Sequence, residues 1–494
     1  MPHDAHRPVD FFAHGSLPVP QVTCAQAERI AARHLGVSAR ATPLGSQQDA
    51  NFLLRADDGT APLILKIANP AFGPVEIDAQ DTAADLIAAA HPELRVATVV
   101  RHTDGSPRRT TVDIGGRPAV ARLLRFLPGG PLTGSRHLSP VTVAGMGAVV
   151  AKVSGALRDF RHPGLERVLQ WDVRHASRVV AELAGHIDDP DRRDAVRTAT
   201  VEAWAAVESH AAALPSQAVH LDLTDDNLIR SLVGHPPMPD GIIDFGDLTT
   251  SWAVGELAVS LSSMLHHDGV EPHHVLPAVR AFHAARPLSV QEAEVLWPLV
   301  VLRAAVLVAS GHHQAAVDEE NAYASAALDH EWLIFERATR LPHQVMTGLV
   351  RDAIGAADAP SRPHAPTRTV AASRADAPPR ADAPAGTEAA VHGLLRGVTA
   401  ADIGFLDLST GADSMDRGAW LAADAEHRSA LAALEDGARV VATRHAQARL
   451  TRAPALSAES PATVPTGIEL WLGQAVVAQA PAAGEVLAAA PGRV

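Results

Sequence analysis

The sequence predicts an α+β fold of two lobes, a small antiparallel-sheet lobe and a mainly helical lobe, followed by a disordered linker and a partial β-rich domain. Residues 37–127 read as antiparallel strands with one inserted helix, because short apolar runs alternate with Gly, Pro and Asp turns. Residues 137–348 show mainly helical patterns. Residues 356–387 contain no Leu, Ile, Phe or Met, so they cannot form a packed core. This order predicts a cleft between the two lobes.

We place the domain boundaries where these patterns change. The N-terminal lobe is expected over residues 1–127, and the helical C-terminal lobe over residues 128–350. The Ala/Pro/Arg-rich linker is expected over residues 351–388. Residues 389–494 regain apolar content and end in short segments separated by Gly and Pro, which predicts the small β-rich domain.

Composition excludes several classes of protein. The 42 basic and 56 acidic residues leave a net charge of −14, which argues against a nucleic-acid partner. Cys24 is the single cysteine, so no intramolecular disulfide can form. The apolar run at residues 298–311 is too short for a membrane span and contains Arg303, so we expect a buried helix. With no signal peptide recognised, we expect a cytoplasmic protein without a membrane partner.

The elements of the first lobe follow from local signals. A helix is expected from Thr23, which with Gln26 has capping-box spacing, to Gly36, which supplies the stop. Residues 41–69 read as three strands, the last two joined by a tight Asp-Asp-Gly turn. A helix is expected over residues 74–92. Further strands are expected over residues 96–103, 110–115 and 118–127.

Lysine usage singles out one position. Of the 42 basic residues only Lys66 and Lys152 are lysine, and all the others are arginine. A lysine retained against this bias indicates a site that needs a compact ammonium on a flexible stem. Chance retention explains Lys152 adequately, but it explains Lys66 less well, because Lys66 lies in an apolar strand.

Six aspartates lie between His220 and Asp247, beside two apolar runs that read as short buried strands. Asn227 follows Asp222 by five residues, and Asp244 follows the second strand. Phosphoryl transfer requires a carboxylate that deprotonates the attacking hydroxyl, and oxygen ligands that hold Mg²⁺ against the phosphates. A loop followed by a hairpin brings these three side chains together, and bound cations would neutralise the acidic cluster.

The stretch "HLDLTDDNLI…GIIDFGD" resembles the catalytic signature of the aminoglycoside phosphotransferase and choline kinase family, a branch of the protein-kinase-like fold. Within that group, "GSQQDANFLL", "LILKIANP", "VEIDAQ" and "QWDV" are most similar to hydroxylysine kinases, including kinase-like domains fused to class III aminotransferases. The resemblance covers roughly residues 20–345. It implies a nucleotide- and Mg²⁺-dependent kinase that phosphorylates a small-molecule hydroxyl, with ATP or GTP as the donor. The acceptor is expected to be an amino alcohol or hydroxylated amino acid, ahead of an aminoglycoside.

The resemblance also implies roles for individual residues. Asp222 matches the catalytic base, and Asn227 and Asp244 match the metal ligands. Lys66 matches the lysine that binds the α- and β-phosphates, with Glu76 as its expected ion-pair partner and Asp78 as an alternative. The remaining expected residues are Gly45, Ser46, Asp49, Asn51 and Phe52 in the nucleotide loop, Leu124, Arg125 and Phe126 in the hinge that contacts the base, and His220, Gly246 and Asp247 in supporting positions.

Several interpretations stay open at this level. Leu221 stands where the family commonly has glycine, so it could crowd the catalytic loop. Asp225 and Asp226 either help to hold metal or are solvated. Asp247 either contributes charge to the cleft or caps a helix. Trp171 resembles a family position but suits core packing equally.

The histidine pairs 266/267, 273/274 and 312/313 suggest a metal site, which we disfavour, because adjacent residues of a helix point in different directions and no cysteine accompanies them. Some of these histidines could instead line the acceptor pocket.

The last region resembles a degenerate, truncated lysostaphin-type peptidase domain. Pro465 and Glu469 occupy the positions where that family has zinc ligands, so zinc peptidase activity is disfavoured. An unrelated β-rich module is the alternative. The main alternative to a kinase is a catalytically silent nucleotide-binding module that serves a partner enzyme of the class III aminotransferase type.

Overall fold

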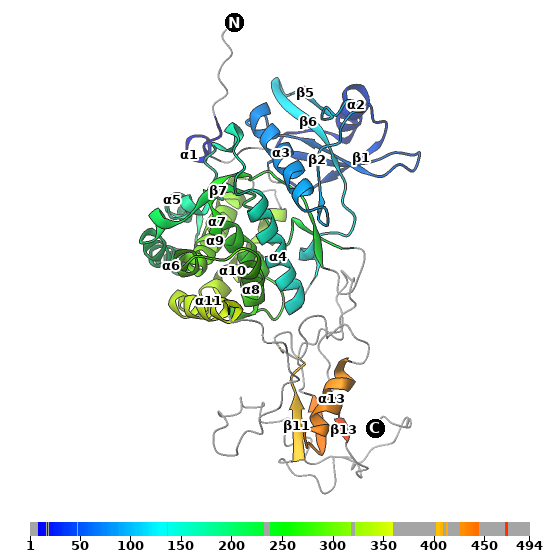
Figure 1. Ribbon diagram of the computed structural model, residues 1–494. Helices are drawn as coiled ribbons and strands as arrows, with labels where there is room; N and C mark the ends of the chain where they lie inside the picture. Colours follow the sequence, from blue (N-terminus) through cyan, green and yellow to red (C-terminus); the bar gives the residue numbers. More distant parts are fainter. Residues whose placement is uncertain are drawn as a thin grey trace, which may run out of the picture. The chain divides into compact units, whose positions relative to one another are not determined.

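The computed structural model describes residues 8–358, apart from residues 16, 18, 47, 136, 232–237 and 318–321, and residues 402–408, 412, 425–443 and 470–472. The chain divides into two compact units (Figure 1). The first comprises Met1–Ser135 and Thr142–Ala359, and the second comprises Arg136–Val141 and Pro360–Val494. Each unit is described by itself.

The N-terminal lobe of the first unit is built on one antiparallel sheet, as the sequence predicts. Three of its strands come from the predicted run over residues 41–69, and the Asp-Asp-Gly turn joins the second to the third. The order across the sheet is β1 (Arg40–Leu44), β2 (Ala50–Arg55), β3 (Leu63–Ile67), β6 (Arg117–Arg125) and β5 (Arg109–Ile114).

Helix α2 (Cys24–Leu35) covers one face of this sheet. Its N-terminus is capped by Thr23 and Gln26, and Gly36 ends it in the left-handed conformation, so the predicted helix signals are confirmed. Buried side chains of α2 form a core with alternate residues of the strands. These strand residues are Ala50, Phe52, Leu54, Leu65, Ile67, Val112, Ala119, Ala121 and Leu123.

Strand alternation places the intervening residues on the opposite face, where α3 (Pro74–Ala90) packs. Val120 of β6 and Ile77 of α3 belong to a second core cluster. Arg122, two residues further along β6, bonds to Asp81 of α3. Lys66 lies between Leu65 and Ile67 and therefore points to this second face, which is the face that carries the polar network.

The expected strand over residues 96–103 is only partly formed. Regular pairing is limited to β4 (Arg95–Val96), with isolated bridges at Val99 and Arg101. β4 pairs in parallel with β9 (Pro239–Ile242), so it belongs to a small sheet of the C-terminal lobe. The predicted strand was too long. Apolar alternation marks a segment that can pair, but it does not say which sheet a short segment joins.

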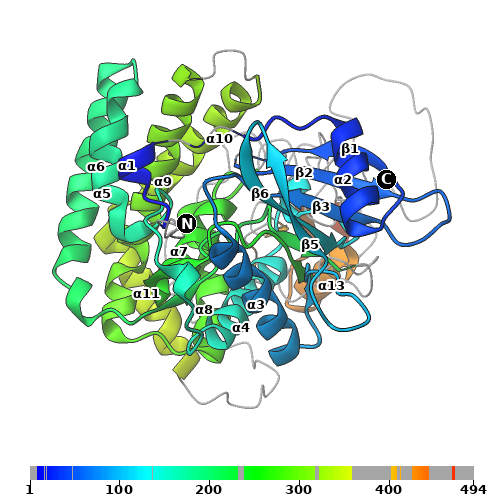
Figure 2. The same cartoon turned by 90° about the horizontal axis from the view of Figure 1, so that it is seen from above.

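Apart from its short strands, the C-terminal lobe is helical and surrounds one long buried helix, α9 (Val290–Val317). Figure 2 shows these helices on one side of the view and the five-stranded sheet with α2 on the other. α9 is the one described helix long and apolar enough to cross a membrane, but 89% of its apolar window is buried inside the protein. The other helices are α4 (Pro140–Ala156), α5 (Ala176–Leu183), α6 (Pro190–Glu208), α7 (Ala253–Met264), α8 (Leu276–Ala285), α10 (Ala322–Ala338) and α11 (His343–Asp358).

The expected linker begins later than residue 351, because α11 continues to Asp358. Its remaining residues lie outside the described part of the chain, as do Pro465 and Glu469. In the second unit, the described residues form a mixed three-stranded sheet and a helix, so this part is α/β and not simply β-rich. Its elements are β11 (Ile403–Leu406), α13 (Ala425–Glu435), β12 (Val440–Thr443) and β13 (Leu470–Leu472).

Candidate active site

Lys66 connects the two lobes. Its ammonium is almost completely buried and lies 2.7 Å from Oδ1 of Asp244 and 3.1 Å from Oδ2 of Asp49. Burial opposes the charged form, but the carboxylates of Asp244 and Asp49 outweigh it and raise the pKa of Lys66. The lysine therefore stays protonated, and the spatial convergence expected for Lys66 and Asp244 is present.

Asp49 holds the loop between β1 and β2 against β3. Its side chain accepts a hydrogen bond of 2.9 Å from the Asn69 amide as well as pairing with Lys66. The Asp49 amide in turn donates to the Ser46 hydroxyl at 3.1 Å. Gly45, just before this turn, has nothing within 4 Å of the position that a side chain would occupy. Asp49 therefore anchors the loop, whereas the space beside Gly45 is open.

Asn51 and Phe52 lie on opposite faces of β2. Asn51 lies opposite Lys66 in the register of the sheet, and its buried Oδ1 has no hydrogen-bond partner among the described residues. Phe52 belongs to the core beneath α2, so strand alternation directs it away from the nucleotide loop to which sequence analysis assigned it.

The expected hinge stands at the end of β6. Leu124 and Arg125 are its last two residues and Phe126 follows, all partly or fully exposed. The Arg125 amide donates to the Thr98 carbonyl at 3.0 Å, which leaves the chain here tied to the segment after β4. The hinge role of these residues stays a prediction.

The two candidate partners of Lys66 on α3 make other contacts. The Glu76 carboxylate accepts a hydrogen bond of 2.7 Å from the Gly73 amide at the start of the helix. Asp78 pairs with Arg109 at 2.7 Å and with His162 at 3.3 Å. Lys66 forms ion pairs with Asp49 and Asp244, so the pairing with Glu76 stays a prediction and Asp78 is no substitute for it.

The loop that carries Asp222 and Asn227 runs from β7 (Ser216–Val219) to β8 (Leu228–Arg230). β8 and β9 form the predicted antiparallel hairpin, which returns the chain to Asp244. Within the loop, the Asn227 amide nitrogen donates to Oδ2 of Asp222 at 2.5 Å and to the Asp222 carbonyl at 2.9 Å. The five-residue spacing therefore closes a turn that fixes the two side chains relative to each other.

Two residues other than glycine have positive φ in the described part of the chain, and both are in this site. They are Leu221, at φ 65°, and Asp244, at φ 56°. Such conformations are costly for a residue with a Cβ, about 1–2 kcal/mol each. The angle at Leu221 explains why a glycine suits this position, and the leucine side chain is fully buried.

Glu256, in the first turn of α7, supports the strained loop. Its carboxylate accepts hydrogen bonds from the amides of His220 at 2.6 Å and Leu221 at 3.0 Å. Complete burial raises the pKa of Glu256 to about 7, and the two amide bonds only partly offset the burial.

Both ring nitrogens of His220 bond to the backbone, which is a structural role. Its Nδ1 accepts from the Asp222 amide at 3.3 Å and its Nε2 donates to the Ile243 carbonyl at 3.2 Å, which assigns the neutral Nε2–H tautomer. Burial lowers the pKa of His220 to about 4, so the ring stays neutral beside Asp244.

Asp244 remains ionised. Burial works against its charge, but Lys66 and the Gly246 amide, which donates at 2.9 Å, lower the pKa of Asp244 to about 2. The oxygens left for a cation are Oδ2 of Asp244 and Oδ1 of Asn227, whose amide nitrogen is already used. Oxygen donors of this kind fit Mg²⁺.

Asp222 and Asp247 share a buried cation, Arg303 of α9. Arg303 Nη2 lies 3.7 Å from Oδ1 of Asp222, and its guanidinium lies over the Trp171 ring at 4.8 Å. Burial and the neighbouring Asp247 raise the pKa of Asp222, and Arg303 opposes this. Burial also raises the pKa of Asp247 to about 6, against the attraction of Arg167 and Arg303. β10 (Thr249–Trp252) follows Asp247, so the helix-capping interpretation of this residue is wrong.

Sequence reasoning missed the roles of Arg303 and Glu256. Both lie in apolar helices, and the signal that marks them is a charged residue within a run that is otherwise buried. It also missed Asp49 as an ion-pair partner of Lys66.

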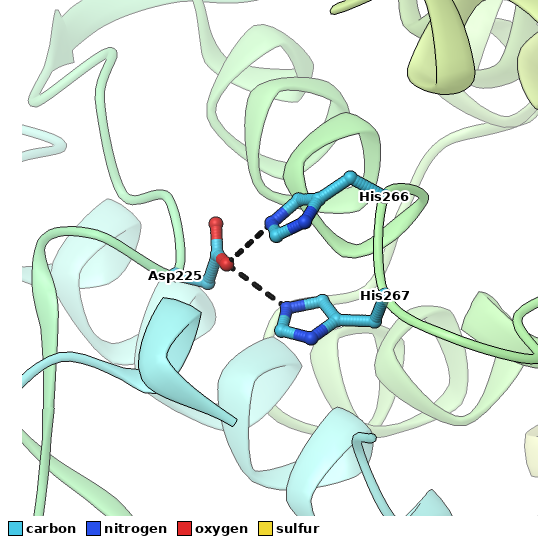
Figure 3. Close-up of side chains that lie close together, drawn as sticks. All are labelled: Asp225, His266 and His267. Carbon is cyan, nitrogen blue, oxygen red and sulfur yellow. Dashed lines mark hydrogen bonds and ion pairs between the residues drawn. The ribbon is translucent and has the colours of Figure 1, made fainter. Parts of the chain in front are cut away.

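Asp225 is buried, so it is not solvated as one interpretation had it. Its Oδ2 lies 2.8 Å from Nε2 of His266 and 2.9 Å from Nε2 of His267 (Figure 3). Adjacent residues of one helix would point in different directions, but α7 ends at Met264, before both histidines. Beyond that end the two rings stack, with centroids 4.2 Å apart, and both face the same carboxylate.

Comparison with known proteins identifies the family of this chain. The sequence profile of the phosphotransferase enzyme family matches residues 40–293, just over half of the chain. Hydroxylysine kinase of Mus musculus is 25% identical over 307 residues, covering 58% of this chain and 80% of that protein. Hydroxylysine kinase of Danio rerio is 24% identical over 308 residues, covering 58% and 82%. The structure of a microcompartment-associated aminopropanol kinase, 20% identical, matches with a TM-score of 0.51 over 66% of this chain and 99% of that one, which shows the shared fold.

Proposed function

Because the chain belongs to the phosphotransferase enzyme family and is a small-molecule kinase, we propose that it transfers the terminal phosphoryl group of ATP or GTP to the hydroxyl of an amino alcohol or hydroxylated amino acid. One observation carries the proposal. The 2.7 Å contact between Lys66 Nζ and Asp244 Oδ1 places the ammonium of the sheet lobe beside the acids of the helical lobe.

In this proposal each side chain has a defined task. Lys66 binds the α- and β-phosphates and orients the nucleotide, while Asp49 and Asp244 keep its ammonium in place. Asn227 and Asp244 would hold Mg²⁺, which neutralises phosphate charge when bound.

Asp222 accepts the proton of the acceptor hydroxyl as that oxygen bonds to the terminal phosphorus. The nucleoside diphosphate leaves as the bond to its oxygen breaks. The Asn227 amide fixes the rotamer of the Asp222 carboxylate through its 2.5 Å hydrogen bond. The raised pKa of Asp222 makes its carboxylate a stronger proton acceptor than an exposed aspartate.

Arg303 supports a hydroxylated amino acid as the acceptor. This residue is 5% exposed, and its Nε and Nη1 groups find no hydrogen-bond partner among the described residues. Unpaired donors of a buried guanidinium are costly, and a carboxylate is the group that matches them best. Since Nη2 lies 3.7 Å from the proposed base, a carboxylate close to the reacting hydroxyl is within reach.

The test is a phosphotransfer screen with hydroxylysine, ethanolamine, choline, homoserine and aminoglycosides, each with ATP and GTP. Nucleoside diphosphate release that depends on both acceptor and Mg²⁺ supports the proposal. Release with none of the acceptors, together with retained nucleotide binding, contradicts it and favours the silent nucleotide-binding module.

The strained Leu221 is the observation that keeps the silent module as a second candidate, because the leucine occupies a position that suits glycine. A functional link to a class III aminotransferase also stays a prediction.

A further inference from the structure

Asp225, His266 and His267 form a cluster that the proposed phosphoryl transfer does not use. Asp225 lies in the catalytic loop between Asp222 and Asn227, and the two histidines follow the end of α7. The ligand atoms of the three side chains lie within 4.8 Å of one another. The side chains of Asp225 and His267 are 2% and 1% exposed, and that of His266 is 14% exposed. The cluster is therefore shielded from bulk solvent except at His266.

His267 shows that this cluster needs a further proton or a cation. Its Nδ1 lies 2.7 Å from the Ser135 carbonyl oxygen, which can only accept a hydrogen bond, so Nδ1 carries the hydrogen. In a neutral ring Nε2 then has a lone pair, and this lone pair faces Oδ2 of Asp225 at 2.9 Å. Either a second proton or a metal ion must lie between these atoms.

The arrangement around His267 is also that of metal-binding histidines. In such sites one ring nitrogen binds the metal and the other donates to a carbonyl or carboxylate, which fixes the orientation of the ring. The Ser135 carbonyl supplies this outer contact. The second imidazole, His266, directs its Nε2 to the same carboxylate oxygen at 2.8 Å (Figure 3).

We propose that Asp225, His266 and His267 bind a divalent transition-metal ion of the Zn²⁺ class, with water completing the coordination. Two imidazole nitrogens and one carboxylate oxygen are a common donor set for Zn²⁺, and Mg²⁺ prefers oxygen alone. At metal–ligand distances of about 2.0–2.2 Å, tetrahedral ligand atoms stand roughly 3.3 Å apart. Each Nε2 would therefore move about half an ångström away from Oδ2 of Asp225.

This site has different ligands from the Mg²⁺ site expected at Asn227 and Asp244. Asp225 is tied to the surrounding elements through its backbone, since its carbonyl accepts from Thr133 at 3.1 Å and its amide donates to Ser263 at 3.2 Å. A metal here would link the loop that carries Asp222 and Asn227 to the chain that follows α7. Its role would be to stabilise the catalytic loop, and it would take no part in the chemical step.

The experiment uses the full chain, stripped of metal with a chelator, and measures the binding of Zn²⁺ and Co²⁺ in the presence of excess Mg²⁺. We expect one tightly bound equivalent and the intense visible absorption of tetrahedral Co²⁺. Asp225→Asn and His266→Gln should each raise the Kd for Zn²⁺ by at least about 100-fold, since losing an outer-shell partner alone costs about 10- to 100-fold. His273→Gln is the matched control, because it alters an exposed member of another histidine pair and should leave the Kd unchanged.

Circular dichroism identifies any variant that fails to fold, and the partly exposed His266 is the safer of the two positions. Two results would overturn the proposal. If the wild-type chain retains no equivalent of either ion, the cluster is held together by an imidazolium–carboxylate ion pair and binds no metal. If folded His266→Gln binds Co²⁺ with the affinity and spectrum of the wild type, the ion is bound elsewhere.

Discussion

The Lys66 ammonium lies 2.7 Å from Oδ1 of Asp244, although the two residues are 178 positions apart in the chain. Lys66 belongs to the sheet lobe and Asp244 follows the hairpin of the helical lobe, so this ion pair joins the two halves of the candidate site. Removing one partner of a buried pair leaves the other charge uncompensated.

Lys66→Met should reduce kcat/KM by about 100-fold or more, because the nucleotide phosphates lose their cation and Asp49 and Asp244 lose theirs. The measurement is steady-state nucleoside diphosphate release with the best acceptor from the screen. Lys152→Met is a matched control, since Lys152 is the other lysine of the chain and pairs with Glu93 at the surface. Equal losses in the two variants would contradict the role assigned to Lys66.

Asp222→Asn should lower kcat by about 100- to 10,000-fold while nucleotide binding stays within a few-fold of the wild type. The amide has the shape of the carboxylate but cannot accept the proton of the acceptor hydroxyl. Single-turnover phosphotransfer and calorimetric nucleotide binding measure the two effects separately. Retained turnover would exclude Asp222 as the base.

Leu221 allows a test of backbone strain. Leu221→Ala and Leu221→Gly both lose the buried side chain, but only the glycine also relieves the positive φ of 65°. We therefore expect the glycine variant to be more stable to urea than the alanine variant by about 1–2 kcal/mol. At most other positions alanine is the more stable of the two, so the reverse order here would mean that the loop is not strained.

Glu256 predicts a pH dependence of stability. Its pKa is about 7 in the folded state against 4.5 in the unfolded chain, so the folded protein binds the extra proton between these values. Stability should therefore fall by about 2–3 kcal/mol as the pH rises from 5 to 7. In Glu256→Gln this part of the fall should be absent. Urea unfolding of both proteins at several pH values measures it, and identical profiles would contradict the assignment.

Arg303 predicts how the enzyme chooses between acceptors. Threonine and 1-amino-2-propanol differ only by the carboxylate, so the ratio of their kcat/KM values isolates its recognition. We expect the wild type to favour threonine by about 10-fold or more, and Arg303→Gln to bring this ratio close to one. Because Arg303 also contacts Asp222, both rates will fall, and only the ratio is diagnostic. A preference that survives the substitution would place carboxylate recognition elsewhere.

The sequence by itself determined the features that depend on near neighbours along the chain. The capping box at Thr23 and the stop at Gly36 set the ends of α2, because both act within one helical turn. The five-residue spacing from Asp222 to Asn227 predicted a turn that the hydrogen bond between these side chains closes. The retained lysine marked Lys66 before any contact of its side chain was known.

Tertiary structure alone decided which distant groups meet. Arg303 and Glu256 come from two helices that contact the loop of Asp222, and no spacing in the chain relates them to Asp222 and Leu221. The same holds for His266 and His267, which turn toward Asp225 only because α7 ends just before them. Local signals depend on backbone geometry over a few residues, whereas the electrostatics of this site depend on the packing of whole lobes, which brings these charges together and excludes water.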